Sequence, residues 1–344
     1  MFAAGRPPAN PSRATKEPGR RALLTRLFDN RRGRPAAWIR VSRPAMACQF
    51  EVILPETAAA ALGPAGEALH LLEPIEARLS VFRETSALSE INRTASDRTV
   101  PCDPELMAVL AFCEDLSVAT DGAFDITSTP LSRCWGFLKR EGRLPANTEL
   151  ETALSTVGMS KVQLDRTNRS VRFCTPGLEL NLGAVGKGYA LDVLSAALKK
   201  SGVTDALLSA GSSSVLAVGG EWPVDVRSPQ IPDRPLAHLT MRSGALGTSG
   251  AGEQFVIVDG RRYGHIIDPR TGWPAVGVLS ASVVAPEAAR ADALATAFFV
   301  GGIDLARRYC AEHRDVVAIV TPDDSTRQPQ VFGRSAGVRV EVVR

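Results

Sequence analysis

The segment 280–302 reads Ser-Ala-Ser-Val-Val-Ala-Pro-Glu-Ala-Ala-Arg-Ala-Asp-Ala-Leu-Ala-Thr-Ala-Phe-Phe-Val-Gly-Gly. Its first five residues, which are small or β-branched, are typical of a strand. Pro286 suits the first turn of a helix, an apolar stripe that includes Leu294 and Phe298 follows, and Gly301-Gly302 favours an end to the helix there. The segment therefore predicts a strand over Ser280–Val284 and then a helix from Pro286 to the double glycine.

Two oxygen-bearing side chains lie one turn apart on this predicted helix. Asp292 and Thr296 are spaced i,i+4, so both project from the same helix face. A carboxylate and a hydroxyl in that arrangement can serve as two ligands of a hard cation. The alternative interpretation is a solvated helix face without a metal.

The rest of the chain alternates between short strands, tight turns and long helices. Phe255-Val-Ile-Val258 and Arg262-Tyr-Gly-His265 flank Asp259-Gly260, which is the pattern of a β-hairpin. Hairpins combined with long helices favour an α+β fold over a doubly wound parallel sheet. The polar segment from Leu138 to Pro176 is interpreted as a subdomain excursion. Further strands are expected at Cys48–Leu54, Asp205–Val218, Trp222–Val226, Gln254–Val258 and Val316–Val320, and further helices at Ala58–Leu79 with breaks near its prolines, at Pro104–Thr120 and from residue 181 to Leu198.

Composition describes a globular chain with an uneven distribution of charge. Of its 344 residues 44% are hydrophobic, and no stretch approaches the roughly 18 uncharged apolar residues that a membrane span needs. Residues 1–43 hold eleven of the 40 Arg and Lys residues beside only Glu17 and Asp29 as acids, so the remaining chain is net acidic and is not expected to bind nucleic acid. Residues 1–43 are expected to be a disordered or loosely attached basic extension, and residues 44–344 the folded domain. The extension lacks the apolar core of a secretory signal, which favours a cytoplasmic location.

Cysteine and histidine spacing argues against the common zinc sites. The six cysteines and four histidines include no C-x-x-C pair and no His-x-x-x-His pair. Reduced, buried thiols are therefore expected rather than a zinc site. Among the histidines, only His265 has neighbours that suggest chemistry.

A glycine-rich turn, Asn181-Leu-Gly-Ala-Val-Gly-Lys-Gly-Tyr189, follows an apolar stretch and opens a predicted helix. Free backbone N–H groups at such a turn, the partial positive charge of the helix N-terminus and Lys187 together suit phosphate oxygens. The spacing is neither that of a Walker A loop nor G-x-G-x-x-G. The alternative is a turn whose glycines serve packing only.

Two further segments combine aromatic and polar side chains. Thr120–Leu131 is followed by Cys134-Trp-Gly-Phe137, and the combination suits a flat heteroaromatic ligand. The alternative there is a helix end with two core aromatics. Tyr263–Pro274 places His265 before an Asp-Pro-Arg-Thr-Gly turn. Asp268 is expected to close that turn by bonding the backbone rather than to act in catalysis.

In their order and amino-acid sequence, these segments resemble the ApbE family of flavin transferases, which move FMN from FAD onto a protein threonine or serine. The resemblance runs from about Met46 to Gly302. It implies an ApbE-like α+β fold of mixed, largely antiparallel sheets with packed helices, and a flavin site between subdomains. Its carriers are Leu79-Ser-Val-Phe82 with Ser89-Glu-Ile-Asn92, Gly122-Ala-Phe-Asp125 with Pro130-Leu131 and Trp135-Gly-Phe137, Leu182-Gly-Ala-Val-Gly-Lys-Gly-Tyr189, Thr248-Ser-Gly250, His265-Ile-Ile-Asp-Pro-Arg-Thr-Gly272 and Ala291-Asp-Ala-Leu-Ala-Thr296.

The resemblance also implies a reaction and the residues that perform it. Members of the family are magnesium-dependent enzymes that bind FAD, break its pyrophosphate, release AMP and attach FMN through a phosphoester. A cation held by Asp292, Thr296 and the Ala184 carbonyl would neutralise the pyrophosphate. His265 is the general-base candidate for the acceptor hydroxyl. By motif match, the residues expected at the FAD site are Met46, Phe82, Ala123, Phe124, Asp125, Asn181, Lys187 and Ile266.

The chain departs from the family pattern at three positions. Asn181 stands where the family has Asp, Gly211-Ser212 where it has Gly-Gly, and Gly252 where an aromatic side chain is expected. A hydrogen bond to a charged group contributes about 1.5–3 kcal/mol against about 0.5–1.5 kcal/mol for a neutral one. If the carboxylate at position 181 contacts the ligand, FAD binding roughly tenfold weaker is expected.

Three functions stay open at this point. The first is transfer of FMN to another protein that carries a Thr or Ser flavinylation motif. The family's acceptor pattern has Asp three residues before a Thr or Ser that is followed by Gly-Ala, and Leu246 precedes Ser249-Gly250-Ala251, so the chain is not expected to modify itself. The second is a magnesium-dependent FAD pyrophosphatase that gives FMN and AMP. The third is an FAD-binding protein with decayed catalysis, for which Asn181 is the suggestive feature.

Overall fold

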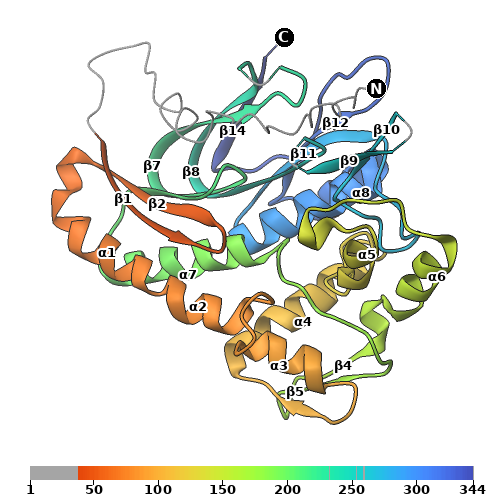
Figure 1. Ribbon diagram of the computed structural model, residues 1–344. Coiled ribbons are helices and arrows are strands. Elements are labelled where there is room, and N and C mark those ends of the chain that lie inside the picture. The colour runs from red at the N-terminus through yellow and green to blue at the C-terminus, as the bar shows by residue number, and fades with distance from the viewer. Residues whose placement is uncertain (1–37, 232, 253, 259, 344) are drawn as a thin grey trace, which may run out of the picture. The chain divides into compact units, whose positions relative to one another are not determined.

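The structure, a computed structural model, describes residues 38–231, 233–252, 254–258 and 260–343. In this part of the chain the largest element is a nine-stranded sheet of order β1-β2-β6-β7-β8-β11-β12-β13, with β14 paired to β8 (Figure 1). All strand pairs in this sheet are antiparallel. Its strands are β1 (Trp38–Ala45), β2 (Cys48–Pro55), β6 (Ala206–Ala210), β7 (Ser214–Arg227), β8 (Pro235–Gly250), β11 (Val278–Ala285), β12 (Val317–Pro322), β13 (Gln330–Phe332) and β14 (Val338–Val342).

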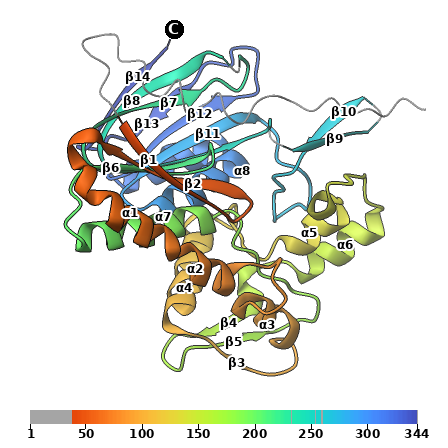
Figure 2. The same cartoon turned by 60° about the vertical axis from the view of Figure 1, so that its left-hand side comes forward.

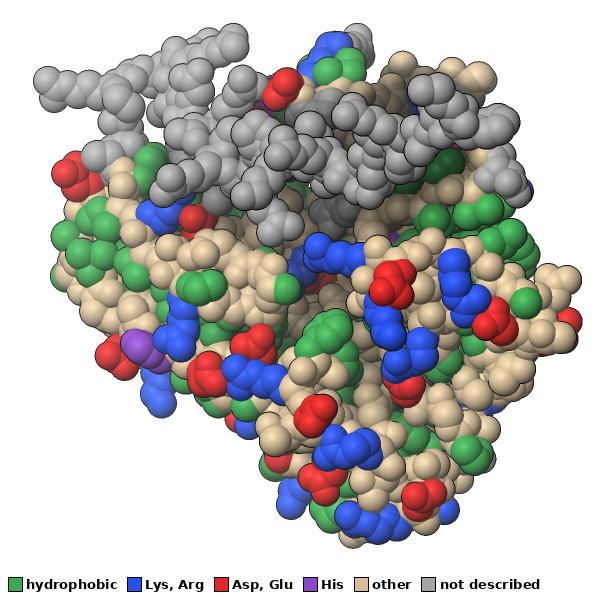
Figure 3. Space-filling model, in the orientation of Figure 1, with side chains coloured by type: hydrophobic (Ala, Val, Ile, Leu, Met, Phe, Trp, Pro, Cys, Tyr) green, Lys and Arg blue, Asp and Glu red, His purple; other side chains and the backbone are tan. Residues whose placement is uncertain are grey.

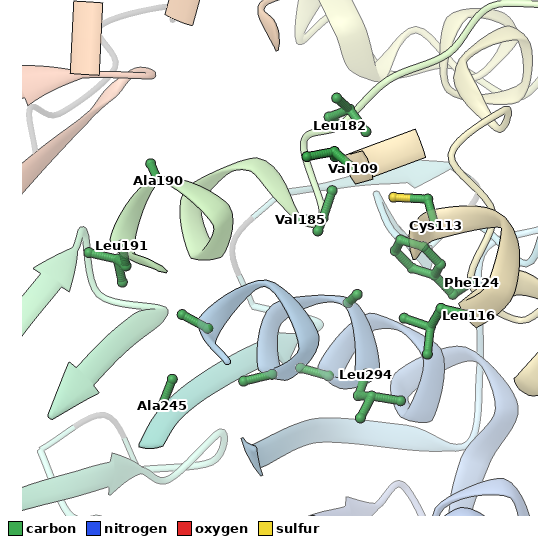
Figure 4. Close-up of a cluster of buried hydrophobic side chains, with 14 of the residues drawn as sticks. Val109, Cys113, Leu116, Phe124, Leu182, Val185, Ala190, Leu191, Ala245 and Leu294 are labelled. Atoms are coloured by element: carbon green, nitrogen blue, oxygen red, sulfur yellow. The ribbon is translucent and has the colours of Figure 1, made fainter. Parts of the chain in front are cut away.

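Two long helices, α7 (Gly186–Lys200) and α8 (Ala288–Glu312), pack against this sheet. Figure 4 shows that both contribute to one cluster of buried side chains, with Val185, Leu191 and Leu294 lying among them. Phe124 and Cys113 approach the same cluster from a different part of the chain. The core therefore lies where the two helices meet the sheet and the segment around Phe124.

Smaller elements surround this core. A three-stranded sheet of order β3-β5-β4 and a separate hairpin of β9 and β10 complete the strands (Figure 2). α1 lies beside β1 of the large sheet, whereas α3 and α4 lie below α7, on the side away from the sheet, in both views. The elements are β3 (Val100–Pro101), β4 (Val162–Asp165), β5 (Ser170–Phe173), β9 (Phe255–Val258), β10 (Arg261–Gly264), α1 (Leu62–His70), α2 (Leu72–Leu79), α3 (Ala87–Thr94), α4 (Pro104–Ala119), α5 (Thr129–Cys134), α6 (Asn147–Thr156), and the 3-10 helices η2 (Glu56–Ala61), η3 (Phe137–Lys139) and η4 (Met159–Lys161).

The α+β class and the antiparallel sheets predicted from the sequence are confirmed. Local signals explain several boundaries. Asp103 accepts hydrogen bonds from the N–H groups of Glu105 and Leu106, so α4 begins where the sequence predicted it. The helix expected over Ala58–Leu79 is divided into η2, α1 and α2, and the last two meet at Leu71.

The strand predicted over Asp205–Val218 is wrong in extent. The chain reverses after β6, where Gly211 has a φ of 64°, and β7 then pairs with β6 in antiparallel register. β6 and the first part of β7 are mostly buried, so apolar residues lie on both sides of the reversal and favour a single strand in the sequence. β7 continues through Trp222, with a register shift at Gly219-Gly220. The long strand β8 was not predicted.

The helix that begins after Pro286 breaks at Gly302, as the double glycine predicts, because Gly302 has a non-helical φ of 73° and ψ of −166°. A second helical segment, which was not predicted, follows directly and carries α8 on to Glu312. The second part keeps a buried face that includes Leu305 and Tyr309. Burial of this face stabilises the second segment after the break.

The basic extension was expected to reach residue 43, and this boundary is wrong. Residues 38–43 belong to β1, which pairs with β2 along its length, and Val41 packs against the core. Residues 1–37 lie outside the described residues, so the extension stays a prediction there. Asp259 of the predicted hairpin turn also lies outside them, although Val258 and Arg261 pair on either side of it.

Two expectations drawn from composition can be compared with the structure. No helix among the described residues is both long and apolar enough to cross a bilayer. All six cysteines are free thiols; Cys102, Cys113 and Cys310 are buried as expected, whereas Cys174 is exposed.

Candidate active site

One buried carboxylate forms the centre of the candidate site. Asp292 lies on α8 and is only 8% exposed. The hydroxyl of Ser214, the first residue of β7, donates to Asp292 Oδ1 at 2.7 Å, and the N–H of Gly188, in the first turn of α7, donates to Oδ2 at 2.8 Å. Three elements far apart in the sequence therefore meet at this carboxylate. The interpretation of residues 292 and 296 as a solvated helix face is wrong.

Glycines permit this close approach. A Cβ atom on Gly188 would lie 2.1 Å from the carbonyl oxygen of Ala288, and one on Gly247 of β8 would lie 2.6 Å from that of Ala291. α8 is further tied to α7 by Asp192, whose carboxylate accepts the N–H groups of Ala288 and Ala289 at 2.8 and 2.9 Å. Packing and capping together place Asp292 against the start of α7.

The charge of this site is not fully compensated within the protein. Burial raises the pKa of Asp292 to about 6, although Lys187 and the hydrogen bonds from Ser214 and Gly188 act in the opposite direction. The Lys187 ammonium itself binds the hydroxyl of Ser213. Lys187 thus lies within electrostatic range of the carboxylate without pairing to it directly.

The other two expected metal ligands lie on α8 and in the turn before α7. The Thr296 hydroxyl is 3.2 Å from the hydroxyl of Ser249 on β8 and 3.4 Å from the backbone carbonyl oxygen of Asp292. Ala184 lies in the turn that precedes α7, where Gly186 N–H donates to Leu182 O at 2.6 Å. The expected set therefore combines two side chains of α8 with one backbone carbonyl of the turn before α7.

The turn that contains Met46 lies near this centre. Met46 and Ala47 connect β1 to β2, and Cys48 follows directly. Burial raises the pKa of the Cys48 thiol, Lys187 lowers it, and Asp292 raises it further. The thiol therefore lies within electrostatic range of both charged groups, which brings the Met46 turn to the site.

Phe82 and Ile266 are the more peripheral members of the expected flavin site. Phe82 is 80% exposed in the loop between α2 and α3. Ile266 is half-buried, packs against the core and accepts the N–H of Ala275 at 2.9 Å. An aromatic ring as exposed as that of Phe82 has no apolar partner in the fold that would hide it.

The segment Gly122–Asp125 is more deeply buried than a ligand-lining role suggests. Ala123 and Phe124 are each 1% exposed and belong to the core, so in this structure neither residue presents a surface to a ligand. The Asp125 carboxylate accepts the N–H and hydroxyl of Thr127 at 2.8 and 2.6 Å and the N–H of Met159 at 3.0 Å. Burial raises the pKa of Asp125 and these hydrogen bonds oppose that rise. In this structure its side chain joins two segments of the fold.

The aromatic residues that follow are structural. Trp135 is fully buried and Phe137 is 6% exposed, so neither ring is available to stack on a ligand. The indole N–H of Trp135 donates to the Gly272 carbonyl at 2.9 Å, which anchors the segment that follows His265. The alternative of two core aromatics is confirmed.

His265 is oriented by a backbone carbonyl. Its Nδ1 lies 3.1 Å from the carbonyl oxygen of Gln254, which also accepts the His265 N–H at 3.1 Å. Because a carbonyl only accepts, this contact requires the proton on Nδ1 and leaves Nε2 as the basic nitrogen of the neutral ring. The Asp268 carboxylate accepts hydrogen bonds from the backbone N–H and from the guanidinium of Arg270. The expected role of Asp268 in closing the turn is therefore confirmed.

A family model described as the ApbE family matches residues 46–320. The chain belongs to the ApbE family. The FAD:protein FMN transferase of Treponema pallidum (strain Nichols) is 31% identical over 81% of this chain and 83% of the relative. An FAD:protein FMN transferase of Klebsiella pneumoniae (strain 342) is 28% identical over 74% of this chain and 81% of the relative.

Solved structures support the same assignment. The ApbE protein of Thermotoga maritima has a TM-score of 0.77 and 28% identity, covering 87% of this chain and 97% of that one. The flavin transferase ApbE of Vibrio cholerae has a TM-score of 0.73 and 25% identity, covering 88% and 98%. The match extends over nearly the whole of each solved chain, so the described part of this protein is an ApbE fold.

The structure also explains how this ApbE chain accommodates Asn181. Asn181 Oδ1 accepts the N–H of Gly183 at 2.8 Å, a contact that an aspartate oxygen could make equally well. The preceding residue, Leu180, exchanges two hydrogen bonds with the Asn92 side chain, at 2.8 and 2.9 Å. Asn92 thus fixes the residue that precedes the glycine-rich turn. The Asn181 side chain makes the hydrogen bond within the turn, so the turn does not need a carboxylate at position 181.

The residues present suit a hard cation by their chemistry. A carboxylate, a hydroxyl and a carbonyl are oxygen ligands of the kind that Mg²⁺ prefers. The raised pKa of Asp292, caused first by burial, marks a carboxylate that a nearby cation would stabilise in its charged form. Among the described residues there is no group of three or more His, Cys, Asp or Glu side chains that could hold a metal, so the single carboxylate would act with neutral ligands.

Sequence reasoning missed two polar residues of this site. Ser214 contacts Asp292 across 78 residues of sequence, and Glu76 contacts the backbone of Met46 across 30. The run Ser212-Ser213-Ser214 after an apolar segment was the available signal for the first of these. Glu76 has no motif of its own and could be found only from the fold.

Proposed function

We propose that this chain is an FAD:protein FMN transferase, which cleaves the pyrophosphate of FAD, releases AMP and attaches FMN to a Thr or Ser of an acceptor protein. The observation that carries the proposal is the convergence of Asp292 and Lys187 on the first turn of α7, in a chain of the ApbE family. The relatives from Treponema pallidum and Klebsiella pneumoniae are named FAD:protein FMN transferases, which supports the proposal.

The start of α7 is suited to phosphate. Its N-cap residue is Val185, which has no side-chain acceptor, so the first backbone N–H groups are not capped by their own residue. Two of these groups are already bonded, since the Gly186 N–H donates to the Leu182 carbonyl oxygen and the Gly188 N–H donates to the Asp292 carboxylate. The partial positive charge of the helix end and the Lys187 ammonium would both attract the FAD pyrophosphate.

Asp292, Thr296 and the Ala184 carbonyl are the residues that would hold Mg²⁺. The ion, when bound, would offset negative charge on the pyrophosphate. Ser214 and Gly188 hold the Asp292 carboxylate in a single orientation, because each donates to it from a different element. The protein therefore presents Asp292 as a metal ligand with a fixed orientation.

His265 would take the proton of the acceptor hydroxyl. The contact of Nδ1 with the Gln254 carbonyl makes Nε2 the nitrogen that receives it. Hydroxyl oxygen of the acceptor would then attack the FMN phosphorus, the bond to the AMP phosphate would break, and AMP would leave with the electron pair. The half-buried Ser249 of this chain is already bonded to Thr296, which supports an acceptor on another protein.

The test is incubation of the full chain with FAD, Mg²⁺ and a peptide that carries Asp three residues before a Thr followed by Gly-Ala. AMP, free FMN and peptide mass are followed together by mass spectrometry. The proposal requires a peptide that gains FMN as AMP appears. FMN and AMP without a peptide adduct would identify a pyrophosphatase, and intact FAD would contradict both activities.

A pair of variants on α8 provides the control. Asp292→Asn should abolish AMP release, since it removes the only carboxylate of the expected set. Asp304→Asn changes an exposed aspartate on the same helix, whose side chain is 92% exposed, and should leave the rate unchanged. Equal rates in the two variants would exclude the role given to Asp292.

A further inference from the structure

The turn between β1 and β2 adopts an unfavourable backbone conformation. Ala45 pairs with Cys48, so Met46 and Ala47 alone form the turn. Their φ angles are 47° and 57°. Positive φ at both positions is the pattern of a type I′ hairpin turn, which favours Asn-Gly and is disfavoured for side chains with an ordinary Cβ. Such a conformation persists only where surrounding groups hold it, and it is concentrated at ligand sites.

Glu76 is the group that holds this turn. Glu76 lies on α2, and its Oε1 accepts the backbone N–H of Met46 at 3.2 Å. In a two-residue hairpin the N–H of the first turn residue points away from the ladder and needs another acceptor. The Glu76 carboxylate satisfies that N–H in the conformation the turn adopts.

The second oxygen of the same carboxylate holds another loop. Glu76 Oε2 accepts from Arg83 Nη2 at 3.2 Å, and Arg83 Nη1 donates to Glu73 at 2.9 Å. Figure 3 shows basic and acidic side chains interspersed over the part of the surface formed by α1 and α2. Arg83 directly follows Phe82, whose exposed ring lies on a loop that the Ser80 hydroxyl also fixes by accepting the Phe82 N–H.

We propose that Glu76 is a positioning residue of the flavin site, which joins the Met46 turn and the Phe82 loop through the two oxygens of one carboxylate. The inference rests on the proposed function, because Met46 and Phe82 are expected to contact FAD. The two loops belong to different parts of the sequence, and both are bonded to Glu76. The distance between them therefore depends on this one side chain. Its effect is therefore on the binding of FAD rather than on the chemical step.

Two variants of Glu76 separate the contacts. Glu76→Ala removes both acceptors, whereas Glu76→Gln keeps an oxygen for the Met46 N–H and loses the charge that pairs with Arg83. The Kd of the full chain for FAD is measured by flavin fluorescence, and KM and kcat are measured from AMP release. E76A should raise Kd and KM about tenfold with kcat changed less than about twofold, and E76Q should lie between it and the wild type. Glu84→Gln, an exposed change in the same loop, is the matched control and should leave all three unchanged.

Relief of backbone strain in the Met46 turn gives a second test. FAD affinity should recover in the E76A variant only if Glu76 acts by holding this turn. Ala47→Gly removes the Cβ from a position with positive φ, so in the E76A background it should restore FAD affinity by about fivefold. The same substitution should have little effect in the wild type, where Glu76 already holds the turn. If E76A does not fold, as judged by circular dichroism, the comparison of E76Q with A47G/E76Q decides instead.

The outcomes distinguish the inference from the function on which it rests. Wild-type affinity in E76A, or no recovery with A47G, overturns the positioning role. A wild-type protein that binds FAD but releases no AMP overturns the proposed activity, while the Kd values of the variants still decide the role of Glu76. A wild-type protein that does not bind FAD overturns both.

Discussion

The hydroxyl of Ser214 lies 2.7 Å from one oxygen of the Asp292 carboxylate and 3.0 Å from the other. Both residues are buried, at 1% and 8% exposure, so this contact is shielded from water. A hydrogen bond to a buried charged group stabilises the fold more than one at the surface. Ser214 therefore determines both the orientation of the carboxylate and part of its ionisation.

Ser214→Ala should weaken the site without rearranging the fold. The Asp292 carboxylate would lose one of its two donors, which should lower the free energy of unfolding by about 1–3 kcal/mol and the rate of AMP release by about tenfold. Chemical denaturation and the AMP assay measure the two effects. Ser155→Ala, at an exposed position on α6, is the control. An unchanged rate in S214A would show that the orientation of Asp292 does not limit cleavage.

When Mg²⁺ is limiting, the rate of FAD cleavage should fall as the pH is lowered through about 6. Burial raises the pKa of Asp292 to about 6, and only the charged carboxylate can attract a cation. A rate of AMP release that is constant from pH 7.5 to 5 would contradict this assignment. S214A should move the acidic limb to higher pH, because the lost hydrogen bond favours the charged form.

The same pKa predicts the stability of the metal-free protein. The folded pKa lies above the ordinary value of 3.8, so the folded state binds the proton more tightly, and stability is lost as pH rises from about 4 to about 6. Asp292→Asn removes this loss. Relative to the wild type in EDTA, the variant should gain on the order of 3 kcal/mol of unfolding free energy between pH 4 and pH 7. Denaturant titrations at the two pH values test it, and a gap that does not change with pH would refute it.

Two glycines of α7 should respond differently to the same substitution. A Cβ on Gly188 would lie 2.1 Å from the Ala288 carbonyl oxygen, whereas one on Gly186 would meet nothing within 4 Å. Gly188→Ala should therefore cost about 3 kcal/mol and displace the N–H that binds Asp292. Gly186→Ala should be neutral or slightly stabilising. Thermal unfolding of both variants is the measurement, and equal melting temperatures would show that α7 and α8 can separate without cost.

Asn181→Asp should improve FAD binding while leaving the turn intact. The Gly183 N–H needs only an oxygen acceptor at this position, which aspartate also provides. If the family's carboxylate contacts the ligand, the Kd for FAD should fall by up to about tenfold. Asn147→Asp, at the exposed start of α6, serves as the control for the added charge. Equal affinity in N181D and the wild type would mean that the carboxylate acts only in the turn.

Features encoded over a few residues could be predicted from the sequence. The helical spacing of Asp292 and Thr296, the hairpin around Gly260 and the capped start of α4 are local patterns, and each was found. The break of the helix at Gly302 was found as well, but the helical segment after it was not, because that segment depends on burial of a face that includes Leu305 and Tyr309. The reversal at Gly211 was missed although a glycine marks it, because apolar residues lie on both sides of it.

The composition of the site follows the same division. Motifs pointed to Asp292 and Lys187, which the structure brings together at the start of α7, and to His265, whose role stays a prediction. Ser214 and Glu76 depend on contacts made 78 and 30 residues away, which no local pattern records. Ala123 and Phe124 show the opposite case: the motif is present, yet packing leaves their side chains in the core.

The position of β8 in the large sheet orders the events of biosynthesis. This strand pairs with β7, which precedes it in the chain, and with β11 and β14, which follow. β14 is made last of these four strands, so β8 cannot complete its pairing until all of them have left the ribosome. Asp292 is likewise made after Gly188 and Ser214, so the proposed flavin site can form only once α8 has emerged.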